Sequence, residues 1–148
     1  METTTRPYEP ADREACLALF DGNTPRFFDA SERAEYDAFL RALETPYSVI
    51  EQGGRIVACG GHAVEADGTT AVLCWGMVDR GLQGTSLGRR LTQARLAAAR
   101  ATPGVTAVRL STSQHTEGFY RRFGFRTLKV AQDGFAPGIH SHEMRLDL

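Results

Sequence analysis

The spacing of apolar residues predicts two helices in the first third of the chain, after a short strand at residues 4–9. The first helix is expected to begin at Asp12 and run to Phe20, where a turn-rich stretch breaks it. The second begins where Asp29 and Glu32 have the spacing of a capping box. Its apolar positions form one stripe that we expect to face a core: Tyr36, Phe39, Leu40 and Leu43.

Short apolar segments separated by glycine-containing turns predict three antiparallel strands next. These strands are expected at residues 47–51, 55–65 and 69–78. The third contains an unbroken apolar run from Ala71 to Trp75, where a half-exposed strand would alternate. Such a run is typical of a central strand that is covered on both faces.

A helical period then returns, and Leu87, Leu91, Ala94 and Ala98 form a stripe on a helix that ends before Pro103. The remaining segments are a strand at 105–111, a helix at 116–123, a strand at 126–132, a loop at 133–138 and a strand at 140–148. The order is β-α-α-β-β-β-α-β-α-β-β. It predicts an α/β fold, with one sheet between helices, in a single domain over residues 1–148.

The composition is that of an ordinary globular protein, with 148 residues, 42% of them apolar and 24% charged. No apolar run approaches the length of a membrane span, and the first residues lack the apolar segment of a leader, so we expect a cytoplasmic protein without a membrane partner. The three cysteines, Cys16, Cys59 and Cys74, lack metal-site or disulfide spacing and are expected to be buried thiols. We expect no metal site.

The net charge of −1 conceals a division along the chain. Residues 1–79 carry 14 acids and 6 bases, whereas residues 80–148 carry 4 acids and 11 bases. Most of the positive charge lies in residues 80–126, which hold 9 Arg and one acid. This asymmetry indicates either an anionic ligand or simply arginines on solvated helix faces.

The segment from Val78 to Leu91 carries the clearest chemical signal. A strand ends, a glycine-rich turn follows and a helix begins, so free backbone N–H groups and the positive end of the helix dipole meet at one place. That place suits a phosphate or pyrophosphate. Gly84 and Gly88 allow close approach of the backbone, while Thr85 and Ser86 offer hydroxyl groups. Arg89 lies in the first turn of this helix, where a cation opposes the helix dipole, so its place also favours a bound anion.

Two blocks in this half of the chain resemble the GNAT superfamily of N-acyltransferases. Gln83-x-x-Ser86-x-Gly88 is similar to its acyl-CoA signature, and Tyr120 with the following Gly124-Phe125 is similar to its later Tyr-x-x-x-Gly-Phe block. Ser86 stands where glycine is usual, and Ser113 stands where many members have an Asn that holds the cofactor. The element order also matches the GNAT fold, a mixed, mostly antiparallel sheet flanked by helices.

The resemblance implies an acetyl-CoA-dependent N-acetyltransferase that moves the acetyl group directly to an amine. The residues expected to bind acetyl-CoA are Met77, Val78, Gln83, Gly84, Thr85, Ser86, Leu87, Gly88, Arg89 and Ser113. Tyr120 matches the tyrosine that protonates the leaving thiolate, although a purely structural place among Phe119 and Phe123 is the alternative. Backbone N–H groups around Val78 would polarise the thioester carbonyl.

The resemblance does not identify the general base. His62, Glu65, His115 or a chain of ordered water molecules could serve, and an unperturbed histidine has the most suitable pKa. Cys74 is a poor nucleophile, because apolar neighbours should raise the pKa of its thiol.

The fold family places the acceptor between two loops, here residues 21–30 with Phe27 and Phe28, and residues 133–138 with Phe135. Aromatic walls beside acids such as Asp29 and Asp133 would suit an amine of apolar or cationic character, whereas plain loop packing is the alternative. The acceptor could be a polyamine, an amino acid, an aminoglycoside or a peptide N-terminus. The sequence leaves open whether the chain forms a homodimer.

Two other classes of function are weighed against an enzyme. One is a non-catalytic, regulatory CoA-binding module on the same fold, against which Tyr120 argues. The other is a nucleic-acid module built on residues 80–126. It ranks last, because the arginines there lack an interleaved aromatic series and the net charge of the chain is not positive.

Overall fold

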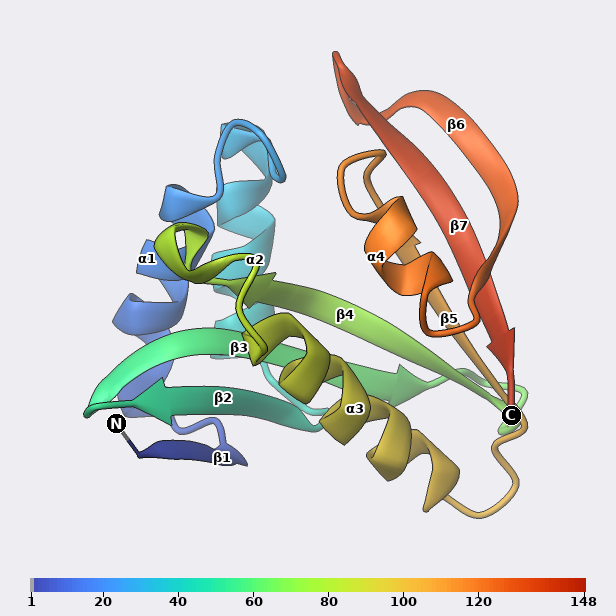
Figure 1. Ribbon diagram of the computed structural model, residues 1–148, viewed down its shortest axis with the longest axis horizontal. Helices are drawn as coiled ribbons and strands as arrows, with labels where there is room; N and C mark the ends of the chain where they lie inside the picture. Colours follow the sequence, from blue (N-terminus) through green and yellow to red (C-terminus); the bar gives the residue numbers. More distant parts are fainter. Residues whose placement is uncertain (1) are drawn as a thin grey trace.

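A computed structural model describes residues 2–148 as a seven-stranded sheet in the order β1-β2-β3-β4-β5-β7-β6, with helices on both faces (Figure 1). The expected fold class and element order are confirmed. The elements are β1 (Thr3–Pro7), α1 (Arg13–Gly22), α2 (Arg33–Arg41), β2 (Tyr47–Gln52), β3 (Arg55–Val64), β4 (Thr70–Val78), α3 (Leu87–Arg100), β5 (Ala107–Thr112), α4 (Glu117–Arg121), β6 (Arg126–Ala136) and β7 (Ile139–Asp147). Short 3-10 turns at Pro10–Asp12, Ala30–Glu32 and Arg80–Leu82 connect them.

Strand β4 lies at the centre of the sheet, as its apolar run predicts. It pairs antiparallel with β3 and parallel with β5. The parallel pairing extends only from Thr70 opposite Ala107 to Val72 opposite Arg109. Beyond that point the two strands diverge, which Figure 1 shows as a V that opens toward the carboxyl ends of both strands.

A bulge interrupts β4 just beyond this divergence. Gly61 of β3 lies opposite Cys74, yet Cys59 lies opposite Met77, so β4 carries one extra residue. Trp75 has a φ of 45°, a left-handed backbone conformation that residues other than glycine rarely adopt. The extra residue reverses the faces of the strand. Leu73 packs in a cluster with α3, whereas Met77 packs on the opposite face with α1 and α2.

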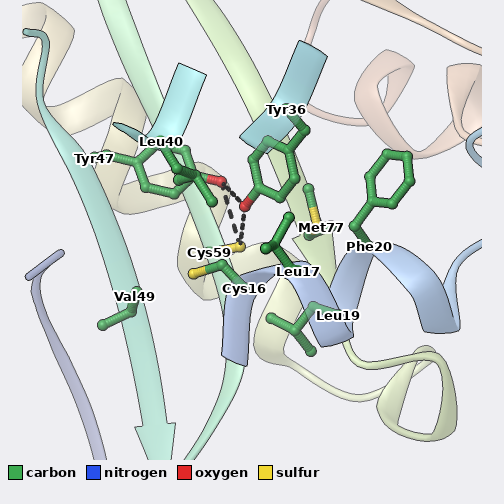
Figure 2. Packing of buried hydrophobic residues seen from close by; sticks show 10 residues of the cluster. All are labelled: Cys16, Leu17, Leu19, Phe20, Tyr36, Leu40, Tyr47, Val49, Cys59 and Met77. Atoms are coloured by element: carbon green, nitrogen blue, oxygen red, sulfur yellow. Dashed lines mark hydrogen bonds between the residues drawn. The ribbon is translucent and has the colours of Figure 1, made fainter. Parts of the chain in front are cut away.

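The core under α1 and α2 contains a small hydrogen-bonded network as well as apolar side chains (Figure 2). The hydroxyl groups of Tyr36 and Tyr47 lie 2.7 Å apart, and both lie close to the sulfur of Cys59. Tyr47 also donates a hydrogen bond of 2.7 Å to the carbonyl oxygen of Trp75. Burial raises the pKa of both tyrosines, so both remain protonated, and Tyr47 holds the bulge through its hydrogen bond to Trp75.

The predicted capping box at the start of the second helix is confirmed. The Asp29 carboxylate accepts from the backbone N–H of Ser31, and the Glu32 carboxylate accepts from that of Asp29. Asp12 precedes α1 as expected. Its carboxylate instead accepts from the N–H of Glu9 and binds the Arg6 guanidinium, so it closes the 3-10 turn before α1.

Two sequence predictions are wrong. The loop expected at residues 133–138 is reduced to a turn at residues 137–138, because β6 continues to Ala136 and a shift in its register near Asp133 (φ 53°) absorbs the irregular sequence. The expected stripe of α3 is also misplaced. Ala94 is exposed, and the buried face instead carries Thr92 and Arg95 beside Leu91. The sequence could not reveal this face, because an arginine is normally assigned to the solvent side.

No helix within residues 2–148 is both long enough and apolar enough to span a membrane.

Candidate active site

A cleft of about 700 Å³ occupies the space between the diverging strands β4 and β5. The N-terminus of α3, helix α4 and the loop between α1 and α2 complete its walls. The cleft brings together most of the predicted site residues: Phe27, Phe28, Val78, Gln83, Gly84, Thr85, Gly88, Arg89, Ser113, Tyr120 and Phe135. Phe135 reaches it from strand β6, where the sequence predicted a loop.

Three of the residues expected to bind the cofactor do not line this cleft. The side chain of Met77 is buried with α1 and α2, and that of Leu87 is buried between α3 and the sheet. Ser86 is the exposed residue that precedes the first turn of α3. Their predicted contacts with a ligand would therefore come from backbone atoms, or from the Ser86 hydroxyl at the rim.

The turn between β4 and α3 is held by its own side chains. The Asp79 carboxylate accepts a hydrogen bond of 2.8 Å from the N–H of Gly81, and the Thr85 hydroxyl donates one of 2.6 Å to the carbonyl of Leu82. Gly84 has a φ of 85°, which explains the glycine. The N–H groups of the first turn of α3 have no partner inside the helix; that of Leu87 donates to the Thr85 hydroxyl at 3.5 Å, and the next ones are available to an anion at the cleft.

Gly88 is closely packed against α4. A Cβ atom there would lie 3.3 Å from the ring of Phe119, so its absence lets α4 approach the first turn of α3. This close approach places Tyr120, the next residue of α4, at the cleft.

Tyr120 packs within the apolar cluster and also lines the cleft. Its ring packs edge-on against Phe119 and Phe125, at centroid distances of 5.1 and 5.8 Å. Its hydroxyl lies at the cleft, 3.4 Å from a terminal nitrogen of Arg95. The apolar contacts thus orient the ring, while the hydroxyl is available to a reactant.

Asn23 is a site residue that the sequence analysis missed. It is 1% exposed, and its amide nitrogen donates to the carbonyl oxygens of Leu19 and Val78, at 2.8 and 3.0 Å. Its amide oxygen accepts a hydrogen bond of 2.8 Å from Gln83. Asn23 therefore joins the end of α1, the end of β4 and the turn before α3. The sequence offered only a helix-breaking residue at this position.

The wall formed by the α1–α2 loop is aromatic and acidic. Phe28 stacks on Phe20 at 5.0 Å, and Phe27 meets the ring of His115 edge-on at 5.9 Å. Glu32 and Glu35 also line this side of the cleft. Burial raises the pKa of Glu32.

His115 is the one member of the three proposed bases, His62, Glu65 and His115, that lines the cleft. Its pKa is lowered by desolvation and by the positive charge of Arg26, so the neutral form is favoured. Glu65 is engaged by Arg109 at 2.9 Å. Cys74 also lines the cleft, and burial raises the pKa of its thiol, in agreement with an inert cysteine.

Within residues 2–148, the structure contains no group of three or more His, Cys, Asp or Glu side chains that could hold a metal ion.

No protein of curated function matches this sequence. Solved structures of the same fold are numerous. The protein yncA of Salmonella typhimurium, determined with its cofactor acetyl-CoA, has a TM-score of 0.78 at 21% identity and covers 100% of this chain and 95% of its own. The ribosomal-protein-S18-alanine N-acetyltransferase of Escherichia coli has a TM-score of 0.78 at 20% identity, over 99% and 94%. An aminoglycoside 6'-N-acetyltransferase complexed with coenzyme A has a TM-score of 0.78 at 14% identity, over 97% and 96%.

At these identities the likeness shows the fold. The family is shown by the sequence itself, because residues 17–148 match the model of the acetyltransferase (GNAT) domain. That match includes the turn before α3, the strands on both sides of the cleft and Tyr120, and it confirms the expected class of enzyme, an acyltransferase. The chain belongs to the GNAT family of acetyltransferases.

Proposed function

We propose that this protein transfers an acetyl group from acetyl-CoA directly to a primary amine of a small molecule or of a peptide N-terminus. One observation carries the proposal. A single cleft is lined by the turn suited to a pyrophosphate, by the ends of β4 and β5 that do not pair with each other, and by Tyr120 with its hydroxyl.

The residues of the cleft fit acetyl-CoA. The first turn of α3 offers N–H groups, and Arg89 and Arg122 add positive charge at the same end. Beyond Val72, β4 has no pairing with β5, so its backbone can bind an extended chain between the strands. Two proteins of the same fold support this role, since they were determined with acetyl-CoA or coenzyme A.

Each chemical task has a candidate group in the chain. Backbone N–H groups near Val78, beyond the bulge, would polarise the thioester carbonyl. The bound thioester supplies the acetyl group: the amine nitrogen forms a bond to the carbonyl carbon, and the carbon–sulfur bond breaks. Tyr120 would donate its phenolic proton to the departing sulfur. His115, directly or through water, would accept the proton that the amine loses.

The acceptor is proposed only as an amine, because the same fold serves different acceptors. One neighbour in structure acetylates an alanine of ribosomal protein S18, and another acetylates an aminoglycoside. The acidic residues Glu32 and Glu35 on the acceptor side favour a cationic amine here.

Thiol release from acetyl-CoA in the presence of a panel of amines tests the proposal. Turnover with at least one amine is expected, and Tyr120→Phe should lower kcat by about 10²-fold while the Kd for acetyl-CoA changes little. Phe123→Leu, which alters the same apolar cluster away from the cleft, serves as the control. Tight CoA binding without turnover of any amine would favour a regulatory module instead, and full activity of Tyr120→Phe would reject the role of that residue.

A further inference from the structure

Arg95 has an unusual place for an arginine. It lies on the buried face of α3, is 4% exposed and lines the cleft. Its guanidinium lies against the backbone of two glycines in the sheet. A Cβ atom on Gly76 would come within 2.7 Å of Arg95 Nη2, and one on Gly60 within 3.3 Å of its guanidinium carbon. The two glycines therefore form a slot that a longer residue at either position would fill.

The guanidinium has almost no partner in this slot. Among the hydrogen bonds formed by residues 2–148, Arg95 has one through its side chain, the 3.4 Å contact with the hydroxyl of Tyr120. Its Nε is buried without an acceptor, and no carboxylate in the described part of the chain forms an ion pair with it. His62, whose pKa is lowered by burial and by the charge of Arg95, adds no negative charge.

Other partly buried arginines of this protein are fully paired. Arg6 binds Asp12 at 2.8 Å and Glu51 at 2.7 Å, and Arg109 binds both Glu65 and Glu143. A buried cation without a counter-charge is destabilising, because it loses its hydration and gains nothing in return. An apolar residue would serve packing better at this position of α3. The charge is thus best explained by an anion that is present only when a ligand is bound.

We infer that Arg95 binds a carboxylate group of a reactant. The inference rests on the proposed function and names a feature of its substrate. A carboxylate matches the forked donors of a guanidinium, which form two parallel hydrogen bonds with it. Arg95 lies between the hydroxyl of Tyr120 and the backbone of Gly76 beside the bulge, the region proposed for the thioester. The carboxylate belongs either to the acyl group of the donor or to the amine acceptor.

The experiment has one arm for each source of the carboxylate. In the donor arm, kcat/KM and Kd are measured for malonyl-CoA and succinyl-CoA against butyryl-CoA and acetyl-CoA. In the acceptor arm, with acetyl-CoA as donor, each amino acid is compared with its carboxamide and its decarboxylated amine. We expect a preference of about 10- to 100-fold for the carboxylate in one arm, which identifies the source.

Variants of Arg95 test whether this residue causes the preference for the carboxylate. Arg95→Met should abolish it, and Arg95→Lys should restore part of it, because lysine keeps the charge without the fork. Arg100→Met, which removes an exposed charge from the end of the same helix, should leave it unchanged. Arg95→Met should also raise the Tm by a few degrees, since it removes an uncompensated buried charge. A lower Tm of Arg95→Met would show that Arg95 stabilises the free protein, and it would contradict the premise that its charge is uncompensated there.

The outcomes separate this inference from the proposed function. Equal rates for carboxylate and neutral reactants in both arms of the wild type would overturn the inference, while turnover of acetyl-CoA with an amine would leave the proposed function intact. A preference that persists in Arg95→Met would also overturn it. Failure of the wild type to bind either CoA or acetyl-CoA would reject both. The wild-type comparisons need no variant, so a misfolded Arg95→Met does not prevent the test.

Discussion

Asn23 connects three elements of the active site through a single buried amide. Asn23→Ala removes its hydrogen bonds to Leu19, Val78 and Gln83, so the carbonyl oxygens of Leu19 and Val78 lose this donor. We expect a loss of stability of about 1–3 kcal/mol and weaker binding of acetyl-CoA, because the turn before α3 is no longer fixed to β4. Thermal unfolding and calorimetric titration would measure both effects.

Gln83→Ala provides the matched control for Asn23. It removes only the tie between Asn23 and the turn, on an exposed side chain, so it should weaken binding with little effect on the Tm. An Asn23→Ala protein as stable as the wild type would show that water replaces the amide.

His115 gives the proposed reaction a dependence on pH. Because desolvation and Arg26 lower its pKa below the reference value of 6.5, the neutral base prevails above that lowered pKa. We expect kcat/KM to rise with pH through a value below 6.5 and then to level off. His115→Gln should lower the rate by about 10²-fold and remove this acidic limb. An unchanged limb in His115→Gln would assign the titration to another group.

At the scale of elements, the bulge in β4 depends on a side chain from another strand. Tyr47→Phe removes the hydrogen bond to the carbonyl of Trp75, at a cost of about 1 kcal/mol. Because the residues after the bulge are proposed to polarise the thioester, kcat should fall while the fold persists. Circular dichroism and steady-state kinetics would test this.

Tyr36→Phe is the control for the bulge. It loses the contact with the Tyr47 hydroxyl but keeps the bond from Tyr47 to Trp75. It should resemble the wild type in kcat even if its Tm falls. Equal losses of kcat in both variants would show that the whole buried network, and not the bulge itself, matters.

The elements that the sequence predicted well are those with a strong local signal. The apolar run of β4, the capping box at Asp29 and the turn before α3 each depend on neighbouring residues, and all are present. The bulge at Trp75 and the buried face of α3 depend on contacts between distant strands and helices. Arg95 is buried because its guanidinium fits the slot beside Gly60 and Gly76, and no pattern of neighbouring residues indicates that this arginine is buried.

For the whole molecule, the charge division along the chain has a counterpart in the cleft. Arg89 and Arg122 lie at the α3–α4 side, whereas Glu32 and Glu35 lie at the side of the α1–α2 loop. The sequence predicted the positive group at Arg89 and an acidic wall, but it placed that wall at Asp29, which does not line the cleft. It could not predict that residues about 60 positions apart, such as Asn23 and Gln83, would meet, because that requires the folded sheet.

This distribution predicts a salt-dependent affinity for CoA. Raising the ionic strength should weaken binding, and Arg89→Ala should weaken it by about 2- to 5-fold at low salt. Arg41→Ala, on the exposed face of α2 and remote from the cleft, is the control. If neither salt nor Arg89→Ala changes the affinity for CoA, the arginines serve only as solvated surface charges.

The slot in the sheet also has an evolutionary consequence. A side chain at position 76 and an arginine at position 95 compete for the same space, so these two positions constrain each other. We expect related sequences that keep the arginine to retain Gly76, and those that lack it to tolerate a side chain at position 76. The pair Gly76 and Arg95 thus provides a signature by which related sequences can be sorted before any of them is assayed.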